Sequence, residues 1–439
     1  MSGITVVALP GLGLDARYYD HLTTALRPQG IEVVALDLPG FGSLACTGSL
    51  PADMVGELTT SVIARIAAVV RGPWVLLGHS MGGKVTSSVA ARTLSGNIGL
   101  FGLIGVILLA PSPPTPEPMD EDRRDTMLGW ATGGPIRGSD AAEFIEQNVA
   151  SPLPAADQGA VRSSITGCSP AVWRQWLTTG SKQDVSDQIG VLPLPALILG
   201  GDQDDDLGAA AQPRLHAGTY PRASYVTVPD CGHLIALEQP EFLAAAVADY
   251  LHEQSLTAPL VPDQWCALIA SERTIPAVRR SLAARAIPDD PSYTPKVLSA
   301  RQLTTLRLLA EVVVPQVDPA IDVAARVDAQ LARGEGDGWR PDGQPPDPEA
   351  YRSALDQLAG TSIDEHTVSA LIDNPALRSW FEDARVDLIR QWLGHPASMA
   401  RIGYDGFAAG SIATIGRGYH LLGPGERDAW EPQELGTTL

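Results

Sequence analysis

The sequence predicts an α/β protein in which a mostly parallel sheet with a helical cap is followed by a smaller, all-helical domain. Three observations lead to this fold class. Short apolar segments alternate with longer amphipathic ones through residues 1–255, which is typical of a sheet covered by helices on both faces. A glycine-rich turn that carries Ser80 joins one such strand to a helix. Beyond residue 297 the pattern becomes wholly helical.

Size and composition exclude several classes of protein. The 439 residues are too many for one typical core, so two domains are expected. The formal net charge of −20 argues against nucleic-acid binding and against an anionic membrane surface, because both partners require clustered Lys and Arg. The N-terminus lacks a positively charged signal segment, so we expect a cytoplasmic protein. Scattered cysteines predict buried free thiols rather than a metal site or a disulfide framework: Cys46, Cys168, Cys231 and Cys266.

The first domain is expected to contain six strands. Between the fourth and the fifth, residues 112–190 lack strand alternation and are too long for a loop, which predicts an inserted helical cap. The alternative is a structural excursion without a role in substrate choice. The expected strands are residues 5–9, 32–37, 74–78, 104–110, 196–200 and 224–229.

The second half divides into a linker and a helical domain. Residues 256–296 are rich in Pro, which predicts a linker with a short helix near residues 277–286. In the domain over residues 297–439, Ser299 and Gln302 form a capping box before a helix over residues 303–314. A second helix is expected over residues 319–333, closed by Gly334 and followed by an irregular Gly/Pro-rich stretch to residue 348. A third helix, opened by Asn374 and Pro375, carries an apolar stripe that includes Trp380, Phe381, Ala384, Leu388 and Trp392.

The turn around Ser80 has the pattern of a nucleophile. Residues 75–83 read Val-Leu-Leu-Gly-His-Ser-Met-Gly-Gly, an apolar strand that enters G-x-S-x-G and then a helix over residues 84–94. This order is typical of a nucleophile elbow, a sharp turn that exposes the serine oxygen. Gly78, Gly82 and Gly83 permit the close approach of neighbouring backbone. The sequence therefore predicts Ser80 as a nucleophile.

A serine nucleophile requires a base, and that base requires an orienting acid. Asp204, in a G-x-x-D pattern after the fifth strand, is the expected acid, with Asp202 and Asp205 as alternatives. The run of acids could also be a solvated turn. His233 follows the sixth strand and is the expected general base, whereas His79, within the elbow, is expected to be structural.

Two backbone N–H groups are expected to stabilise an oxyanion. One belongs to Met81, the residue after the nucleophile, and the other to Leu12 in the glycine-rich loop of residues 10–14. The alternative for that loop is an ordinary glycine turn.

Residues 1–255 resemble the α/β-hydrolase superfamily, in the branch of small esterases, lactonases and meta-cleavage-product hydrolases. Besides the elbow, the resemblance rests on Asp37-Leu38-Pro39-Gly40-Phe41-Gly42, the family's D-x-P-G-x-G loop, and on Gly232-His233 through Glu238-Gln239-Pro240. Pro10 stands where the family has a histidine before Gly11, so only the backbone donor of that loop is kept. The resemblance implies a hydrolase acting on an ester, a lactone or a carbon–carbon bond beside a ketone.

Residues 297–410 are similar to the gluconate 2-dehydrogenase subunit 3 family. The similarity rests on residues 298–315 and 321–336, on the helix with Trp380 and Trp392, and on His395-Pro396 followed by Ile402-Gly403-Tyr404-Asp405-Gly406. Members are small helical partners of flavin-dependent dehydrogenases of the glucose–methanol–choline type, commonly with a twin-arginine export signal that is not found in this sequence. The resemblance implies a flavoprotein partner that carries FAD, and no cofactor in this chain.

Two hypotheses of different classes follow. In the first, a serine hydrolase is tethered by its C-terminal domain to a flavoprotein dehydrogenase, so that opening of a lactone product draws the oxidation forward. In the second, the chain is a non-catalytic small subunit or scaffold of such a complex. The trio of Ser80, Asp204 and His233 favours the first hypothesis, because folding does not require it. A lyase or cofactor-free reaction in the same pocket is a third possibility, since a fold does not determine chemistry.

Overall fold

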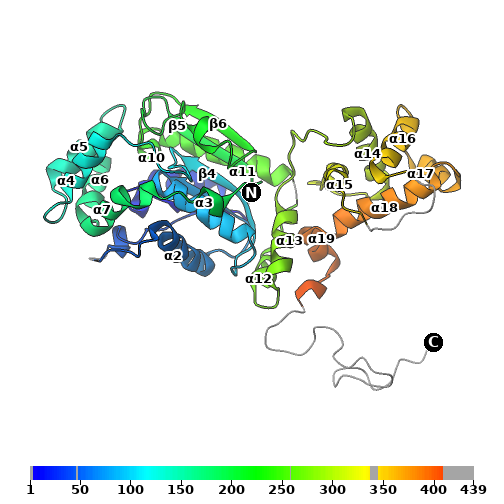
Figure 1. The fold of residues 1–439 in the computed structure, drawn as a ribbon, viewed down its shortest axis with the longest axis horizontal. Coiled ribbons are helices and arrows are strands. Elements are labelled where there is room, and N and C mark those ends of the chain that lie inside the picture. Colours follow the sequence, from blue (N-terminus) through cyan, green and yellow to red (C-terminus); the bar gives the residue numbers. More distant parts are fainter. Residues whose placement is uncertain (1–2, 46–47, 258, 337–344, 409–439) are drawn as a thin grey trace, which may run out of the picture.

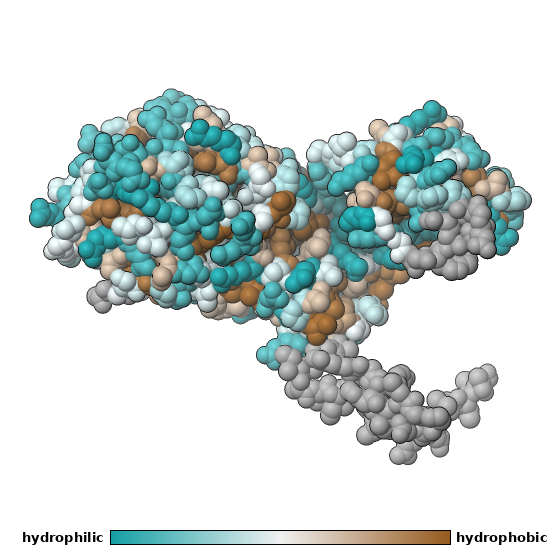
Figure 2. Space-filling view, viewed as in Figure 1, coloured by the Kyte–Doolittle hydropathy of each residue, from teal (hydrophilic) through white to brown (hydrophobic). Residues whose placement is uncertain are grey.

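The structure is a computed structural model that describes residues 3–45, 48–257, 259–336 and 345–408. It has two lobes joined by helices (Figure 1): a sheet lobe up to residue 257 and a helical lobe from residue 297. Each lobe has its own hydrophobic cluster, and a third cluster lies between them. Figure 2 shows a largely hydrophilic face with the more apolar areas near the junction of the lobes.

The sheet lobe contains one parallel sheet of six strands in the order β2-β1-β3-β4-β5-β6. All six expected strands are present, with ends displaced by one or two residues at most. Every residue of β3 and β4 is buried, so both faces of the central sheet are covered, which explains their continuous apolar runs. The strands are β1 (Thr5–Leu9), β2 (Glu32–Ala35), β3 (Trp74–His79), β4 (Leu103–Leu109), β5 (Ala196–Gly201) and β6 (Ala223–Val228).

Helices flank the sheet in two packed pairs. The helix α2 (Met54–Val69) packs on α3 (Met81–Leu94), and α1 (Asp20–Leu26) packs on α11 (Pro240–Thr257). The helix α3 begins at Met81 rather than at residue 84, because the chain turns into the helix directly after Ser80. Two short helices, α9 (Gln212–His216) and α10 (Ile235–Glu238), follow β5 and β6.

Residues 112–190, expected as a helical insertion, are helical over most of their length. Trp173 is fully buried at their centre, and its indole N–H donates to the carbonyl of Met127 at 2.8 Å. The Trp173 ring also contacts the rings of Phe144 and Trp130, with centroids 5.8 and 6.4 Å away. These aromatic residues form the core of the cap, which comprises α4 (Glu121–Trp130), α5 (Gly138–Asn148), α6 (Ala155–Gly167), α7 (Pro170–Thr178) and α8 (Ser186–Ile189).

Residues 256–296 are more regular than the expected linker. The short helix predicted near residues 277–286 is α13 (Pro276–Ala286), but a second helix, α12 (Asp263–Ala270), was not expected. Pro262 is the N-cap of α12 and Pro276 is the first residue of α13. The prolines therefore begin helices, where their missing N–H costs nothing, instead of keeping the chain irregular.

The two helices α12 and α13 are packed on the sheet lobe. The Arg279 side chain is buried, and its Nη1 donates to the carbonyls of Gly96 at 2.8 Å and Ile98 at 3.1 Å. Phe101 of the sheet lobe lies in one apolar cluster with Trp265 of α12. A truncation near Gln254 would uncover this cluster, so a sheet-lobe variant has to extend to about residue 295.

The helical lobe confirms the predicted capping box and most of the predicted helices. Ser299 caps α14 and exchanges hydrogen bonds with Gln302. The second helix begins at Val323 rather than at residue 319, because Asp322 caps it, and it ends at Gly334 with φ 67°. The stretch 337–344 lies outside the described residues. The helices are α14 (Ala300–Val313), α15 (Val323–Arg333), α16 (Asp347–Leu358), α17 (Glu365–Asp373), α18 (Arg378–Leu393) and α19 (Pro396–Ile402).

The apolar stripe of α18 is buried within the helical lobe itself. Trp380, Phe381, Ala384 and Leu388 are buried in the cluster formed with α14, α15 and α16. The helix begins at Arg378, after Asn374 has accepted hydrogen bonds from the following backbone. In the described residues no helix is long and apolar enough to cross a membrane. Cys168, Cys231 and Cys266 are buried free thiols, as expected, and Cys46 lies outside the described residues.

Candidate active site

Ser80 occupies a strained turn between β3 and α3. Its φ and ψ are 50° and −119°, which few non-glycine residues adopt. Its backbone N–H donates to the carbonyl of Leu109 at 3.0 Å, and its carbonyl accepts from Gly83 at 2.8 Å and from Ser112 at 3.0 Å. A Cβ on Gly82 would lie 2.4 Å from the carbonyl oxygen of Leu9, so only glycine fits beside β1. The turn therefore holds Ser80 between β3 and α3 in the strand–turn–helix arrangement that the sequence predicts.

His233 and Asp204 are joined directly. The His233 Nδ1 lies 2.6 Å from Asp204 Oδ2, and the two side chains are 14% and 5% exposed. The other Asp204 oxygen accepts from the backbone N–H groups of Asp206 and Leu207, both at 3.1 Å. Asp202 has a different partner, because its carboxylate accepts from Cys231 N–H at 3.1 Å. Asp205 is exposed. Of the three acids that the sequence left open, Asp204 is the one in contact with His233.

Several backbone contacts hold the His233 loop. The Glu238 carboxylate accepts from the N–H groups of Gly232, Leu234 and Ala150 at 3.0, 3.0 and 2.7 Å. The His79 ring donates from Nε2 to the carbonyl of His233 at 2.9 Å, which agrees with the structural role expected for His79. The Glu238 carboxylate thus closes the segment from Gly232 to Glu238 into a loop, and this loop fixes the position of the His233 imidazole.

The charges of the pair reinforce each other. Burial opposes ionisation of Asp204, but the charge and hydrogen bond of His233 outweigh it and lower the pKa of Asp204 to about 2. Burial alone would lower the pKa of His233, yet the Asp204 carboxylate raises that pKa above its ordinary value of 6.5. The pair is therefore arranged to stabilise a protonated His233.

The two expected oxyanion donors lie near Ser80. Met81 is the first residue of α3, so its N–H has no acceptor within the helix. Leu12 lines the same pocket as Ser80, and its N–H donates to no acceptor among the residues that the structure describes. A Cβ on Gly11 would lie 2.7 Å from His79 Nδ1 and 3.1 Å from Ser80 Cβ, so glycine brings this loop against the elbow.

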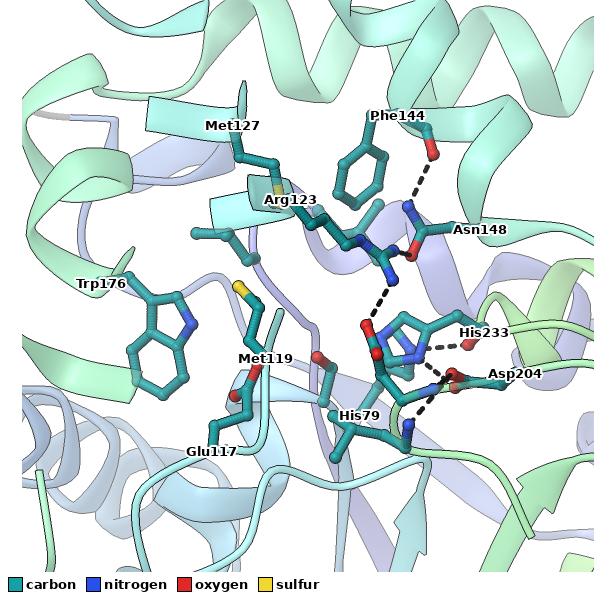
Figure 3. Close-up of a pocket in the computed structure, with 15 residues that line it drawn as sticks. His79, Glu117, Met119, Arg123, Met127, Phe144, Asn148, Trp176, Asp204 and His233 are labelled. Atoms are coloured by element: carbon teal, nitrogen blue, oxygen red, sulfur yellow. Dashed lines mark hydrogen bonds and ion pairs between the residues drawn. The ribbon is translucent and has the colours of Figure 1, made fainter. Parts of the chain in front are cut away.

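Ser80 and His233 line one pocket. Figure 3 shows His233 on one side of it and the cap residues Met127 and Phe144 above. No hydrogen bond joins their side chains among the described contacts; catalytic hydrogen bonds are often long without substrate. The pocket is narrow in this conformation, with a cavity volume of about 40 Å³ for the centres of water molecules. In the part of the chain that the structure describes, no group of three or more His, Cys, Asp or Glu side chains could hold a metal ion.

Four polar residues of the pocket were not anticipated as site residues. Arg123 of α4 forms an ion pair with Asp206 and donates to Asn148 Oδ1 at 2.9 Å. Glu117 lines the pocket on the side of Trp176, across from His233 (Figure 3). Only Asp206 carried a signal in the sequence, as a member of the acidic run after β5. The others come from the cap and from the segment leading into it, where helical periodicity does not reveal which side chains face the sheet.

Comparisons with known proteins agree with this fold. An esterase from Exiguobacterium antarcticum has a similar structure, with a TM-score of 0.51 and 19% identity over 57% of this chain and 92% of its own. A bromoperoxidase from Bacillus anthracis also has a TM-score of 0.51, with 18% identity over 57% of this chain and 92% of its own. At such identities these likenesses show the fold alone.

One curated relative and one family model complete the comparison. The relative, from Mycobacterium phage D29, bears the name of a non-heme haloperoxidase and is 33% identical over 92 residues. That match spans only 32% of the relative and 21% of this chain. The sequence model of the Alpha/beta hydrolase family matches residues 6–246, more than half of the chain, and ends before the helical lobe. The chain therefore belongs to the Alpha/beta hydrolase family.

Proposed function

We propose that the chain is a serine hydrolase that cleaves an ester or a lactone, or a carbon–carbon bond beside a ketone, by a Ser-His-Asp mechanism. The observation that carries the proposal is the 2.6 Å contact between His233 and Asp204 in the pocket that exposes Ser80. Hydrolysis of short p-nitrophenyl esters by the purified protein tests it. A protein that hydrolyses neither these esters nor simple lactones would instead support the scaffold alternative.

The geometry supports a two-step reaction. Ser80 Oγ attacks the carbonyl carbon while His233 Nε2 takes its proton, and Asp204 stabilises the resulting imidazolium. The backbone N–H groups of Leu12 and Met81 stabilise the oxyanion, each contributing about 3 kcal/mol in comparable sites. His233 then donates its proton to the leaving oxygen. In the second step water attacks the acyl carbon while His233 takes its proton. The bond between the acyl carbon and Ser80 Oγ then breaks, and His233 returns the proton to Ser80 Oγ.

The activity is expected to depend on a neutral His233. Because Asp204 raises the pKa of His233, kcat/KM for an ester should fall as the pH decreases through a midpoint above 6.5. The carboxylate of Asp204, with a pKa of about 2, stays ionised throughout this range. A pH profile with a p-nitrophenyl ester measures the midpoint. A midpoint well below 6.5 would contradict the coupling of His233 to Asp204.

The helical lobe is proposed to bind a flavoprotein dehydrogenase in the cytoplasm. The proposal is supported by the similarity of residues 297–410 to the gluconate 2-dehydrogenase subunit 3 family. The apolar stripe of α18 is not the contact surface, because the lobe buries it in its own core. The remaining exposed apolar side chains of α18 are Val386 and Leu393.

Co-expression with a dehydrogenase encoded beside this chain tests the tether. We expect the full chain to co-elute with the FAD-containing subunit in size-exclusion chromatography. A variant that ends at residue 295 keeps α12 and α13, so it should keep esterase activity and lose the partner. If the full chain elutes alone and the shortened chain behaves identically, the tether is wrong.

A further inference from the structure

Glu117 is an acid of the pocket that the proposed Ser-His-Asp chemistry does not use. The residue follows β4 in the segment that leads to α4, and it is only 9% exposed. Its backbone N–H donates to the carbonyl of Ser181 at 2.8 Å, which fixes the segment against the short 3-10 helix Gly180–Lys182 that follows α7. The Ser112 hydroxyl donates to Glu117 Oε2, and the Ser112 N–H donates to the Ser80 carbonyl at 3.0 Å. Glu117 is thus tied to the nucleophile elbow through a single residue.

The second carboxylate oxygen of Glu117 is open to the pocket. Oε1 accepts no hydrogen bond from the residues that the structure describes. It is not completely buried, so a ligand in the pocket can reach it. The side chain lines the same pocket as Ser80 and His233. One oxygen of the Glu117 carboxylate is therefore hydrogen-bonded and the other is open. When a substrate displaces water from the pocket, the open oxygen requires a hydrogen-bond donor from the substrate, because a buried acceptor without a donor costs free energy.

The charges around Glu117 favour a neutral donor over a cationic one. Lys84 is fully buried and donates from Nζ to the carbonyls of Ser181 at 3.3 Å and Gln183 at 2.9 Å. Arg124 is also buried and donates from Nη1 to Ser181 Oγ at 2.7 Å. Burial raises the pKa of Glu117, and the Ser112 hydrogen bond and the charge of Lys84 act against that rise. A substrate cation would be repelled by Lys84 and Arg124, whereas a hydroxyl group carries no such penalty.

The position of Glu117 indicates which part of the substrate it meets. His233 must donate a proton to the leaving oxygen, so the leaving group lies on the side of His233. Glu117 lies across the pocket from His233, near Met119 and Trp176 (Figure 3). The acyl part of the substrate therefore extends toward Glu117.

We propose that Glu117 is a specificity-determining residue that accepts a hydrogen bond from a hydroxyl group on the acyl part of the substrate. The preferred substrates are then hydroxylated esters or hydroxylated lactones rather than plain alkyl esters. This inference rests on the proposed hydrolase function. Wild-type protein should cleave at least one of the p-nitrophenyl esters of 2-hydroxybutyrate and 3-hydroxybutyrate with a higher kcat/KM than the butyrate ester.

The decisive measurement is the ratio of kcat/KM for the better hydroxybutyrate ester to that for butyrate. We expect Glu117→Gln, which replaces the carboxylate by a neutral amide acceptor, to lower this ratio about tenfold, the difference between a hydrogen bond to a charged group and one to a neutral group. Ser112→Ala, which frees Oε2, should lower it less. Glu143→Gln, on the exposed face of the cap helix α5, should leave the ratio unchanged.

The outcomes separate this inference from the proposed function. If wild-type protein cleaves the butyrate ester without preferring either hydroxy ester, the inference is wrong and the hydrolase function stands. That result decides the matter even if Glu117→Gln does not fold. Equal losses on both esters in a folded Glu117→Gln variant would assign Glu117 a structural role and also overturn the inference. If wild-type protein cleaves neither these esters nor simple lactones, both proposals fall.

Discussion

Ser80→Ala should abolish ester hydrolysis. Ser80 is the residue of the elbow that places a hydroxyl in the pocket beside His233, and removal of a nucleophile of this type costs about 10⁶ in kcat. The fold should be unchanged, because no hydrogen bond to Ser80 Oγ is present among the described residues. Replacing serine by alanine therefore removes no contact that holds the turn. Activity with p-nitrophenyl esters and the melting temperature measure both effects.

Covalent labelling provides an independent check on Ser80. An organophosphonate should add one mass increment to the wild-type chain, and peptide mapping should place it on Ser80. Ser95→Ala, at the far end of α3, is a matched control that should keep both the activity and the label. Its hydroxyl donates to the Arg92 carbonyl and accepts from Asn97 N–H, and neither of these residues lines the pocket. A label on another residue, or substantial activity in Ser80→Ala, would show that a different group is the nucleophile.

Asp204→Asn should lower kcat by about 10⁴. The asparagine keeps the size of the side chain but removes the charge that stabilises protonated His233, and its amide can hold the imidazole in the wrong tautomer. His233→Ala should be at least as damaging, because it removes the imidazole that the Asp204 carboxylate contacts. Steady-state kinetics at a pH above the His233 midpoint measures the loss in kcat without a contribution from protonation of His233.

The neighbouring acids supply the controls for Asp204. Asp205→Asn should have little effect, because this side chain is exposed. Asp202→Asn should have at most an intermediate effect, since the asparagine Oδ1 can still accept from Cys231 N–H at the position of the 3.1 Å contact, but without the carboxylate charge. If either of these changes is crippling while Asp204→Asn is mild, Asp204 is not the orienting acid.

Local sequence patterns predict the elements of the sheet lobe more completely than they predict the linker helices and the packing of the helical lobe. The six strands follow from local apolar patterns, and Ser80, Asp204 and His233 follow from the order of turns at the ends of β3, β5 and β6. The Pro-rich composition of residues 256–296 predicts a linker and not the helix α12, because a proline such as Pro262 can either break a helix or begin one. The stripe of α18 could be recognised as apolar, but whether it faced a core or a partner depended on the packing of four helices.

The sequence by itself determined the parallel α/β fold, the strand–turn–helix around Ser80 and the candidate base, because these depend on residues close together in the chain. Only the tertiary structure decided which of three neighbouring carboxylates contacts His233, since Asp202, Asp204 and Asp205 share the same local pattern and differ only in direction. It also brought Glu117 and Arg123 to the pocket. Their placement follows from how the cap packs around Trp173, a long-range arrangement that no short stretch of sequence encodes.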